Sequence, residues 1–223
     1  LVRQIIEPFG VELNSRVVSI GEVCDTADTT MDGFYERVNN SPVGFCDSEA
    51  EKKAMEYIDN IKVSGESCGG IVETVVTGVP VGLGSYVHYD KKLDARIAFS
   101  VMSVQAIKGV EIGMGFEAAR TCGSKVHDEI EYKNGFARLT NNAGGIEGGM
   151  SNGEPIVVRG AMKPIPTLYN PLKTASVIDK TEHKASVERS DACAVPACAV
   201  VVEAVTAFEI ANARHEGQKR SSG

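Results

Sequence analysis

A glycine-rich stretch at residues 141–153 carries five glycines within thirteen residues, directly before an apolar run at residues 155–162. Glycine lets backbone N–H groups approach an anion closely, so this stretch could hold a phosphate or a cofactor. A dinucleotide-binding fingerprint is only partly matched, because Ala143 takes the place of its first glycine and because the stretch precedes a strand. A Walker A loop would end in Gly-Lys-Ser/Thr, which is missing here. An irregular active-site loop and a plain set of structural turns both stay open.

A lysine and two prolines follow the apolar run, in the order Lys163, Pro164, Ile165, Pro166 and Thr167. The prolines fix φ and stiffen the segment. A stiff segment that carries one ammonium and one hydroxyl could present both groups to a phosphate with little loss of entropy. The alternative is a loop that simply leaves a strand.

The elements that must position these segments are predicted from periodicity and turn residues. Strands and helices mix without a strict β-α-β rhythm, so we expect an α+β fold with antiparallel sheets. The expected strands cover residues 11–20, 71–79, 110–114 and 155–162, with a hairpin at 129–139 that turns at Asn134-Gly135. The expected helices end near Pro8, follow a capping box at Ser48–Glu51, cover residues 90–104, and run from Pro196 to about Arg214, while residues 25–45 are expected to form a loop.

Composition excludes several classes of protein. The 223 residues carry a net charge of −7 and 43% hydrophobic residues, which argues against a nucleic-acid surface but allows a few local cations to hold a small anionic substrate. The six cysteines lack zinc-ligand spacing and are expected to be free thiols in a reducing cytosol. There is no run of about 18 apolar residues, so no membrane span is expected.

Six stretches follow one another as they do in chorismate synthases, and the chain resembles that family over essentially its whole length. The stretches are residues 65–73, 78–84, 104–111, 141–155, 163–167 and 189–196. The resemblance implies an α+β fold of antiparallel sheets that sandwich helices, the β-α-β sandwich of the family, incomplete at the N-terminus. Residues 1–216 would be the C-terminal part of a single domain, and residues 217–223 a polar tail.

The resemblance also implies an activity. Chorismate synthases are carbon–oxygen lyases of the shikimate pathway, in aromatic amino acid biosynthesis. They remove phosphate from 5-enolpyruvylshikimate 3-phosphate by anti-1,4-elimination, and they depend on reduced FMN. By resemblance we expect reduced FMN as the cofactor, NAD(P)H as a flavin reductant in some members, a cytoplasmic location and a homotetramer. No nucleic-acid partner and no membrane partner are expected.

Site residues are carried over on the matching motifs. Asp191 matches an aspartate proposed to help move the proton associated with flavin N5, and its alternative role is to cap the following helix. Arg189 matches a position that contacts flavin and substrate, and its alternative is a surface salt bridge. The remaining matches to flavin-binding positions are Gln105, Ala106, Gly148, Lys163, Pro164, Ile165, Pro166 and Thr167.

The chain departs from the family pattern at its start, where the family has a Ser-His-Gly motif, an arginine-rich region and an Arg-Ser-Ser segment. Two histidines proposed as acids in the family belong to that part, and none of the four histidines here matches them. We therefore expect no catalytic histidine and no metal site in this chain. The alternative to a complete enzyme is a fragment that binds flavin or phosphate without turnover, so these 223 residues alone are expected to be inactive.

Overall fold

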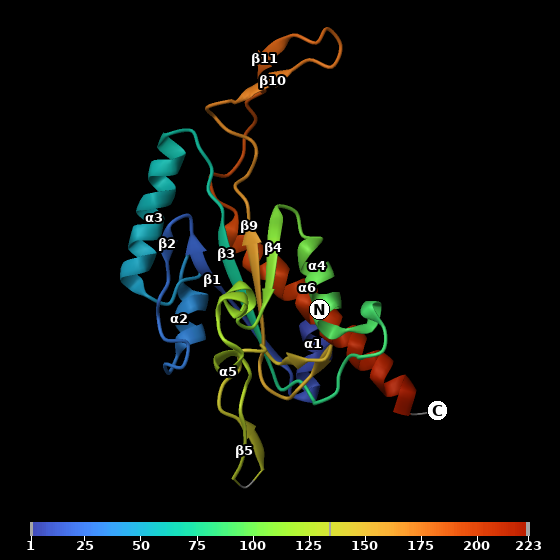
Figure 1. Ribbon diagram of the computed structural model, residues 1–223. Helices are drawn as coiled ribbons and strands as arrows, with labels where there is room; N and C mark the ends of the chain where they lie inside the picture. Colours follow the sequence, from blue (N-terminus) through green and yellow to red (C-terminus); the bar gives the residue numbers. More distant parts are fainter. Residues whose placement is uncertain (1, 134, 222–223) are drawn as a thin grey trace. The chain divides into compact units, whose positions relative to one another are not determined.

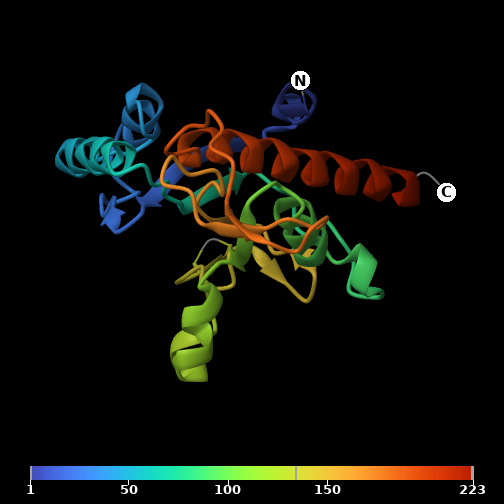
Figure 2. The same cartoon turned by 90° about the horizontal axis from the view of Figure 1, so that it is seen from above.

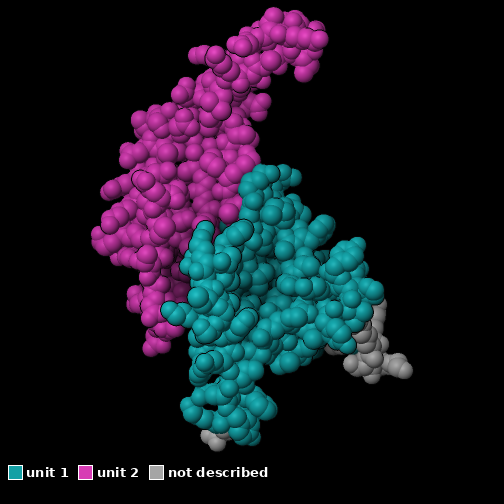
Figure 3. Space-filling model, viewed as in Figure 1, with its two compact units in different colours: residues 1–15, 73–160, 199–223 teal, residues 16–72, 161–198 magenta. Residues whose placement is uncertain are grey.

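The computed structural model describes residues 2–133 and 135–221, and these form two compact units (Figure 3). Unit 1 contains residues 1–15, 73–160 and 199–223, and unit 2 contains residues 16–72 and 161–198. Each unit is therefore assembled from segments that lie far apart in the sequence.

The largest sheet has five strands in the order β2-β1-β3-β9-β4 (Figure 1). Its strands are β1 (Glu12–Ile20), β2 (Val23–Cys24), β3 (Gly70–Thr77), β4 (Ile107–Ile112) and β9 (Ile156–Met162). β1 and β2 are antiparallel, with Ser19 opposite Cys24 and Ile20 opposite Val23. The longer strands bury apolar side chains, among them Leu13 and Val17 of β1, Val72 and Val76 of β3, and Ile156 and Val158 of β9. Together with the antiparallel hairpins, this sheet confirms the predicted α+β class.

Unit 1 owes much of its core to α4 (Leu93–Met102), whose buried residues Leu93, Ile97 and Val101 recur at helical spacing. Figure 2 shows α4 beside α6 (Val195–Ser221), the long red helix. Between them Arg96 Nε lies 3.1 Å from the Glu209 carboxylate. The other elements of this unit are α1 (Val2–Ile6), η1 (Glu7–Phe9), η2 (Tyr89–Lys91), η3 (Gly115–Arg120), α5 (Gly123–Val126), β5 (Ile130–Tyr132), β6 (Phe136–Arg138), β7 (Ile146–Glu147) and β8 (Met150–Ser151).

Unit 2 carries α2 (Phe34–Asn40), α3 (Ser48–Val63) and the hairpin of β10 (Lys173–Ala175) and β11 (Glu182–Lys184). The predicted cap of α3 is wrong by one residue. The Asp47 carboxylate, and not Ser48, accepts hydrogen bonds from the backbone N–H groups of Glu49 (2.8 Å) and Ala50 (3.5 Å). An ionised carboxylate at this position is also favoured by the helix dipole.

The loop expected at residues 25–45 is also partly wrong, because it contains α2. Phe34 and Val38, four positions apart, are buried against Cys46, and Ala27, Met31 and Tyr35 pack around them. Gly33, which precedes α2, has no side chain to cap the helix, so no capping residue marks where the helix begins. A small apolar cluster thus stabilises a helix whose ends carry no sequence signal.

Other boundaries shift by a few residues. β4 begins at Ile107, three residues before the predicted start, and α6 continues past Arg214 to Ser221 because the residues around Gly217 stay helical. The hairpin at residues 129–139 is confirmed as β5 and β6, with Tyr132 opposite Phe136. Asn134 of its predicted turn lies outside the described residues, as does Leu1 of the first predicted helix.

Helix α6 is long and apolar enough over Val195–Gly217 to cross a membrane by length and composition, a possibility that the sequence prediction had excluded. A core helix in a protein without any membrane contact passes the same test, and 44% of the apolar window is buried in the fold. Two acidic residues of this helix make ion pairs within unit 1: Glu203 lies 3.3 Å from Arg3, and Glu209 pairs with Arg96.

Candidate active site

The predicted site residues fall into two groups, one in each unit. Unit 2 contains Arg189, Asp191 and the segment at residues 163–167, which is called the Pro-rich segment below. Unit 1 contains Gln105-Ala106 and Gly148.

The backbone of the Pro-rich segment is held by two serine side chains from other parts of unit 2. The Ser67 hydroxyl donates to the carbonyl oxygen of Ile165 at 2.5 Å, and the Ser190 hydroxyl donates to that of Thr167 at 3.2 Å. The prolines add their own restriction on φ. The segment is therefore fixed from the backbone side.

The side chains of the same segment remain available for a ligand. Among the described residues, the ammonium of Lys163 has only a 3.4 Å contact with the carbonyl of Pro164, and no hydrogen bond of the Thr167 hydroxyl is found. Lys163 is half-buried, so its charge is partly removed from bulk water. A fixed backbone with unengaged cation and hydroxyl suits recognition of an anion.

A cavity of about 500 Å³ lies beside this segment in unit 2. Thr167 and Asp191 both line it, so the structure brings together two residues that are 24 positions apart. The full lining is Ile58, Asp59, Lys62, Glu66, Thr167, Tyr169, Ser190, Asp191, Ala192 and Cys193.

The cavity is acidic, and the predicted cationic residues lie outside its lining. Its lining holds three carboxylates, of Asp59, Glu66 and Asp191, but only one ammonium, of Lys62. Lys163 and Arg189 are not part of the lining, and Arg189 is exposed. A phosphate is therefore better placed at Lys163 than among the three carboxylates, whereas the cavity can take an uncharged ring and exchange a proton with it.

Two of the cysteines, which the sequence predicts only to be free thiols, lie close together at this cavity. Cys193 lines the cavity, and Cys68 lies beside it as the partner of an isolated parallel β-bridge. A hydrogen bond from the Cys68 thiol, together with one from the N–H of Val195, lowers the pKa of the Cys193 thiol against the effect of burial. These two residues are 125 positions apart, and no sequence signal announces the pair.

In unit 1, Gln105 and Ala106 occupy a tight turn between α4 and β4. The N–H of Ile107 donates to the carbonyl of Val104 at 3.2 Å, which closes the turn. Ala106 has φ +69°, a left-handed value that a side chain normally disfavours, so the turn has the form of type II with alanine where glycine is usual. The Gln105 side chain is exposed, and its amide is free to meet a ligand.

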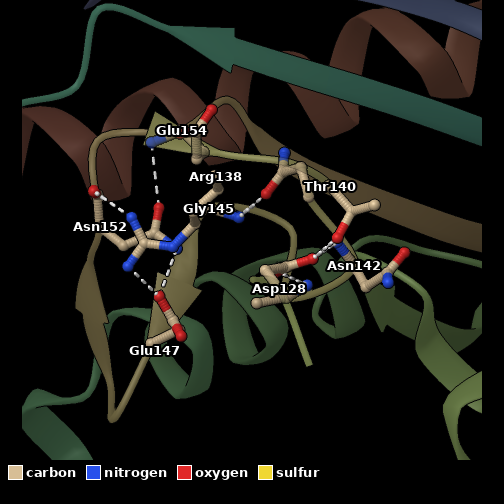
Figure 4. Close-up of polar contacts among 10 residues, drawn as sticks. Asp128, Arg138, Thr140, Asn142, Gly145, Glu147, Asn152 and Glu154 are labelled. Atoms are coloured by element: carbon tan, nitrogen blue, oxygen red, sulfur yellow. Dashed lines mark hydrogen bonds and ion pairs between the residues drawn. The ribbon is translucent and has the colours of Figure 1, made fainter. Parts of the chain in front are cut away.

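The first part of the glycine-rich stretch is held by the chain itself, as Figure 4 shows. The Asp128 carboxylate accepts hydrogen bonds from the N–H groups of Asn142 (2.7 Å) and Ala143 (2.9 Å) and from the Thr140 hydroxyl (2.6 Å). The N–H of Gly145 donates to the side chain of Asn141 at 2.9 Å. These N–H groups are engaged, so they cannot cradle a phosphate.

Gly145 itself is required by close packing. A Cβ there would lie 2.6 Å from the carbonyl oxygen of Pro155, and the residue has φ +77°. A second group of contacts holds the end of the stretch, where Arg138 pairs with Glu147 at 2.5 Å and Asn152 donates to the same carboxylate at 2.7 Å (Figure 4). For this part of the stretch, the interpretation as structural turns is the one that the geometry supports.

Gly148 differs from Gly145. It forms, with Gly149, the two-residue turn between β7 and β8, and both have positive φ, of +61° and +86°. A Cβ on Gly148 would meet no atom within 4 Å, so space is open above its backbone. Among the glycines of this stretch, Gly148 is therefore the one whose backbone a ligand could approach.

Known proteins resemble the chain in sequence over nearly all its length. A family model described as chorismate synthase matches residues 1–214. Chorismate synthase 2 of Bacillus cereus (strain ZK) is 52% identical over 217 residues, which are 96% of this chain and 56% of that protein. Chorismate synthase of Brevibacillus brevis (strain 47) is 52% identical over 219 residues, which are 97% of this chain and 57% of that protein.

A solved structure agrees with the sequence comparison. The crystal structure of a chorismate synthase superimposes with a TM-score of 0.81 at 40% identity and covers 97% of this chain and 60% of that one. The chain thus spans less than two thirds of the length of these relatives. The match of the family model over 214 residues, with this agreement in fold, shows that the chain belongs to the chorismate synthase family.

Proposed function

We propose that this chain supplies flavin-binding residues and an acid–base carboxylate to a chorismate synthase. The reaction is the anti-1,4-elimination of phosphate from 5-enolpyruvylshikimate 3-phosphate, which gives chorismate and depends on reduced FMN. The observation that carries the proposal is the common cavity of Asp191 and Thr167, next to a Pro-rich segment whose backbone is fixed and whose cation is unengaged.

The residues present fit a flavin mononucleotide in size and charge. A volume of about 500 Å³ lies within the range of roughly 300–1,000 Å³ that is usual for cofactor sites. Lys163, outside the acidic lining, would hold the phosphate group, and Thr167 would direct its hydroxyl to the cofactor. By family resemblance, Gln105, Ala106 and Gly148 of unit 1 would contribute an amide and open backbone to a flavin.

Asp191 is the residue to which we assign proton transfer. Reduced FMN, when bound, supplies electron density as the carbon–oxygen bond to phosphate breaks. The Asp191 carboxylate would accept and return the proton associated with flavin N5 through one of its oxygen atoms. Because Asp191 has no hydrogen bond to another described residue, its carboxylate is free for this exchange. Arg189, two residues earlier and exposed, would meet the anionic substrate.

The experiment that tests this assignment replaces Asp191 with asparagine in the complete enzyme. Asparagine keeps the size of the side chain but cannot accept a proton at neutral pH. We expect kcat to fall by about 10²–10⁴-fold, with FMN and substrate affinities almost unchanged. Single-turnover kinetics with pre-reduced flavin measures the chemical step, and a rate equal to that of the unmodified enzyme would exclude proton transfer by Asp191.

A second candidate function is a flavin-binding or phosphate-binding module without turnover. The 223 residues by themselves span 56% of the length of the first relative above. A polypeptide of these 223 residues, assayed anaerobically with reduced FMN and substrate, should then bind FMN weakly and form no chorismate. Measurable turnover by that polypeptide would exclude the second candidate. Tetramer formation, a cytoplasmic location and flavin reduction by NAD(P)H belong to the first proposal and rest on family membership alone.

A further inference from the structure

Two cysteines of unit 2 meet at the edge of the cavity described above. Cys68 precedes β3 and is 3% exposed, whereas Cys193 precedes α6 and lines the cavity. The N–H of Cys68 donates to the carbonyl of Ala192 at 2.8 Å, so the two short segments run side by side as in a parallel sheet. The two thiols are hydrogen-bonded to each other, and neither cysteine forms a disulfide.

This arrangement suits a disulfide. Paired strands lie about 4.7–4.9 Å apart, which falls within the window of roughly 4.4–6.8 Å between Cα atoms that a disulfide requires. Bridge partners also direct their side chains to the same face of the pairing. No large movement of the backbone is needed to join these two sulfur atoms.

The two thiols differ in reactivity, and the difference assigns their roles. Cys193 accepts the hydrogen bond of Cys68 and that of the Val195 N–H, and these lower the pKa of its thiol, which favours the thiolate. As the donor, and by burial, Cys68 has its pKa raised well above the usual value. Cys193 is therefore the accessible nucleophile, and Cys68 is the protected thiol behind it.

Other ionisable groups near the pair either stabilise or destabilise the thiolate form of Cys193. From α3, Lys62 favours the thiolate, whereas Asp59 on the same helix opposes it. Glu66 and Asp191, from the segments that flank Cys68 and Cys193, also oppose the thiolate. The Tyr57 hydroxyl is neutral at pH 7, because burial and the nearby thiols and Glu22 raise its pKa. The hydrogen bond from Cys68 is thus the contact to test.

We propose that Cys193 and Cys68 form an oxidation site for hydroperoxides that enter the cavity. The Cys193 thiolate attacks one oxygen of the peroxide, the O–O bond breaks, and hydroxide or an alkoxide leaves, which oxidises Cys193 to a sulfenic acid. The Cys68 sulfur then attacks the Cys193 sulfur, the S–O bond breaks, and the hydroxyl leaves with the proton of Cys68 as water. The product is a disulfide between the two residues.

The disulfide would tie the chain two residues away from Asp191 to the segment that enters β3. It would also remove the thiol of Cys193 from the cavity wall. The pair would thereby register the presence of peroxide at the cavity that contains the acid–base carboxylate of the proposed function. The oxidation chemistry itself depends on the two cysteines alone, so it can be tested without any catalytic assay.

The experiment treats the purified protein with hydrogen peroxide and maps its cysteines by mass spectrometry without a reducing agent. We expect one dominant product, in which the peptides of Cys68 and Cys193 are joined with the loss of two hydrogens, and which dithiothreitol reverses. The exposed Cys24 and Cys122 are internal controls and should react more slowly. Equal oxidation of Cys193 and these controls, or another dominant disulfide, would overturn the proposal.

A matched pair of variants separates the hydrogen bond from the disulfide. Cys68→Ser keeps a hydrogen-bond donor but cannot form the disulfide, so Cys193 should keep its reactivity and stop at a sulfenic acid that dimedone traps. Cys68→Ala removes the donor as well, so the rate of Cys193 alkylation by iodoacetamide at pH 7 should fall about tenfold, toward that of an ordinary thiol with a pKa of about 8.5. Equal alkylation rates in the two variants would show that Cys68 does not activate Cys193.

Discussion

The glycine-rich stretch of unit 1 and the Pro-rich segment of unit 2 were both predicted to contact the cofactor, and they are built in opposite ways. In the first, the N–H groups are taken up by Asp128 and Asn141, and only Gly148 has open space. In the second, Ser67 and Ser190 hold backbone carbonyls and leave the side chains of Lys163 and Thr167 unengaged. Glycine content therefore indicates close packing here, and the binding capacity lies in the segment whose backbone is fixed by others.

The largest expected effect tests the packing role of the glycine-rich stretch. Gly145→Ala would force a methyl group to within 2.6 Å of the Pro155 carbonyl oxygen at a left-handed φ. Strain and overpacking together should lower the free energy of unfolding by about 2–5 kcal/mol. Urea denaturation measures this loss.

Gly148→Ala is the matched control for Gly145→Ala, since it adds the same methyl group at a similar φ but in open space. It should cost only the left-handed strain, about 1–2 kcal/mol. In the complete enzyme it should also weaken FMN binding, which Gly145→Ala should affect only through stability. Equal losses of stability in the two variants would remove the distinction between the two glycines.

A second prediction concerns the cation of the Pro-rich segment. A charge-assisted hydrogen bond is worth about 1.5–3 kcal/mol, so Lys163→Ala in the complete enzyme should raise the Kd for FMN by about ten- to a hundredfold. Stability should hardly change, because the ammonium contacts only the Pro164 carbonyl among the described residues. Fluorescence titration with substrate present measures the Kd. Lys173→Ala, on the exposed β10–β11 hairpin, is the control, and an equal effect there would reject the specific role of Lys163.

A third prediction uses pH. Burial alone would raise the pKa of Asp128, but hydrogen bonds from Thr140 and from the N–H groups of Ala143 and Asn142, with the charge of Arg138, lower it below 3.8. A lowered carboxyl pKa stabilises the fold above about pH 4, and this stabilisation is lost as pH falls through the folded-state value. Asp128→Asn should therefore cost about 1–2 kcal/mol near pH 7 and progressively less below pH 4. Thermal unfolding of both proteins over this pH range would contradict the assignment if their difference stayed constant.

The smallest expected effect comes from the strained turn at Ala106. Ala106→Gly relieves left-handed strain of about 1–2 kcal/mol and adds about 0.5–1 kcal/mol of chain entropy cost, so a net stabilisation of about 0.5–1 kcal/mol is expected. Lys180→Gly is its control, because Lys180 is the other described non-glycine residue with positive φ, +56°, and lies on the exposed hairpin of unit 2. Cofactor contact at this turn would be supported if both variants gained similar thermal stability and only Ala106→Gly changed the affinity for FMN. A loss of stability in Ala106→Gly would contradict the backbone strain at this residue.

Much of the fold follows from the sequence because apolar residues recur at the right period. The stripe of Leu93, Ile97 and Val101 predicts α4, and the apolar residues of positions 11–20 predict β1. Helix α2 escapes because turn residues surround it, although Phe34 and Val38 already show helical spacing. The exposed β10–β11 hairpin has no buried face, so periodicity cannot report it.

Parts of the site lie beyond what local patterns can give. The resemblance named Thr167 and Asp191, but only the folded chain places them on one cavity. Alanine seldom adopts a left-handed conformation, so the positive φ of Ala106 could not be predicted from its residue type. Cys68 and Cys193 belong to segments that pair through the topology of unit 2, and that long-range pairing has no signal in either segment by itself.

Arg3 and Glu203 form an ion pair although they are 200 positions apart in the sequence. Unit 1 therefore needs both its first segment, residues 1–15, and its last, residues 199–223, to be complete. At a synthesis rate of roughly 5–20 residues per second, about 10–40 s separate the two residues on the ribosome. For that time the first segment of this unit lacks the contacts of α6, since α6 follows the other elements of the unit along the chain. Unit 1 should therefore complete its folding only after translation has passed Glu203, and a stalled nascent chain that ends before Ala199 should remain sensitive to protease in residues 73–160.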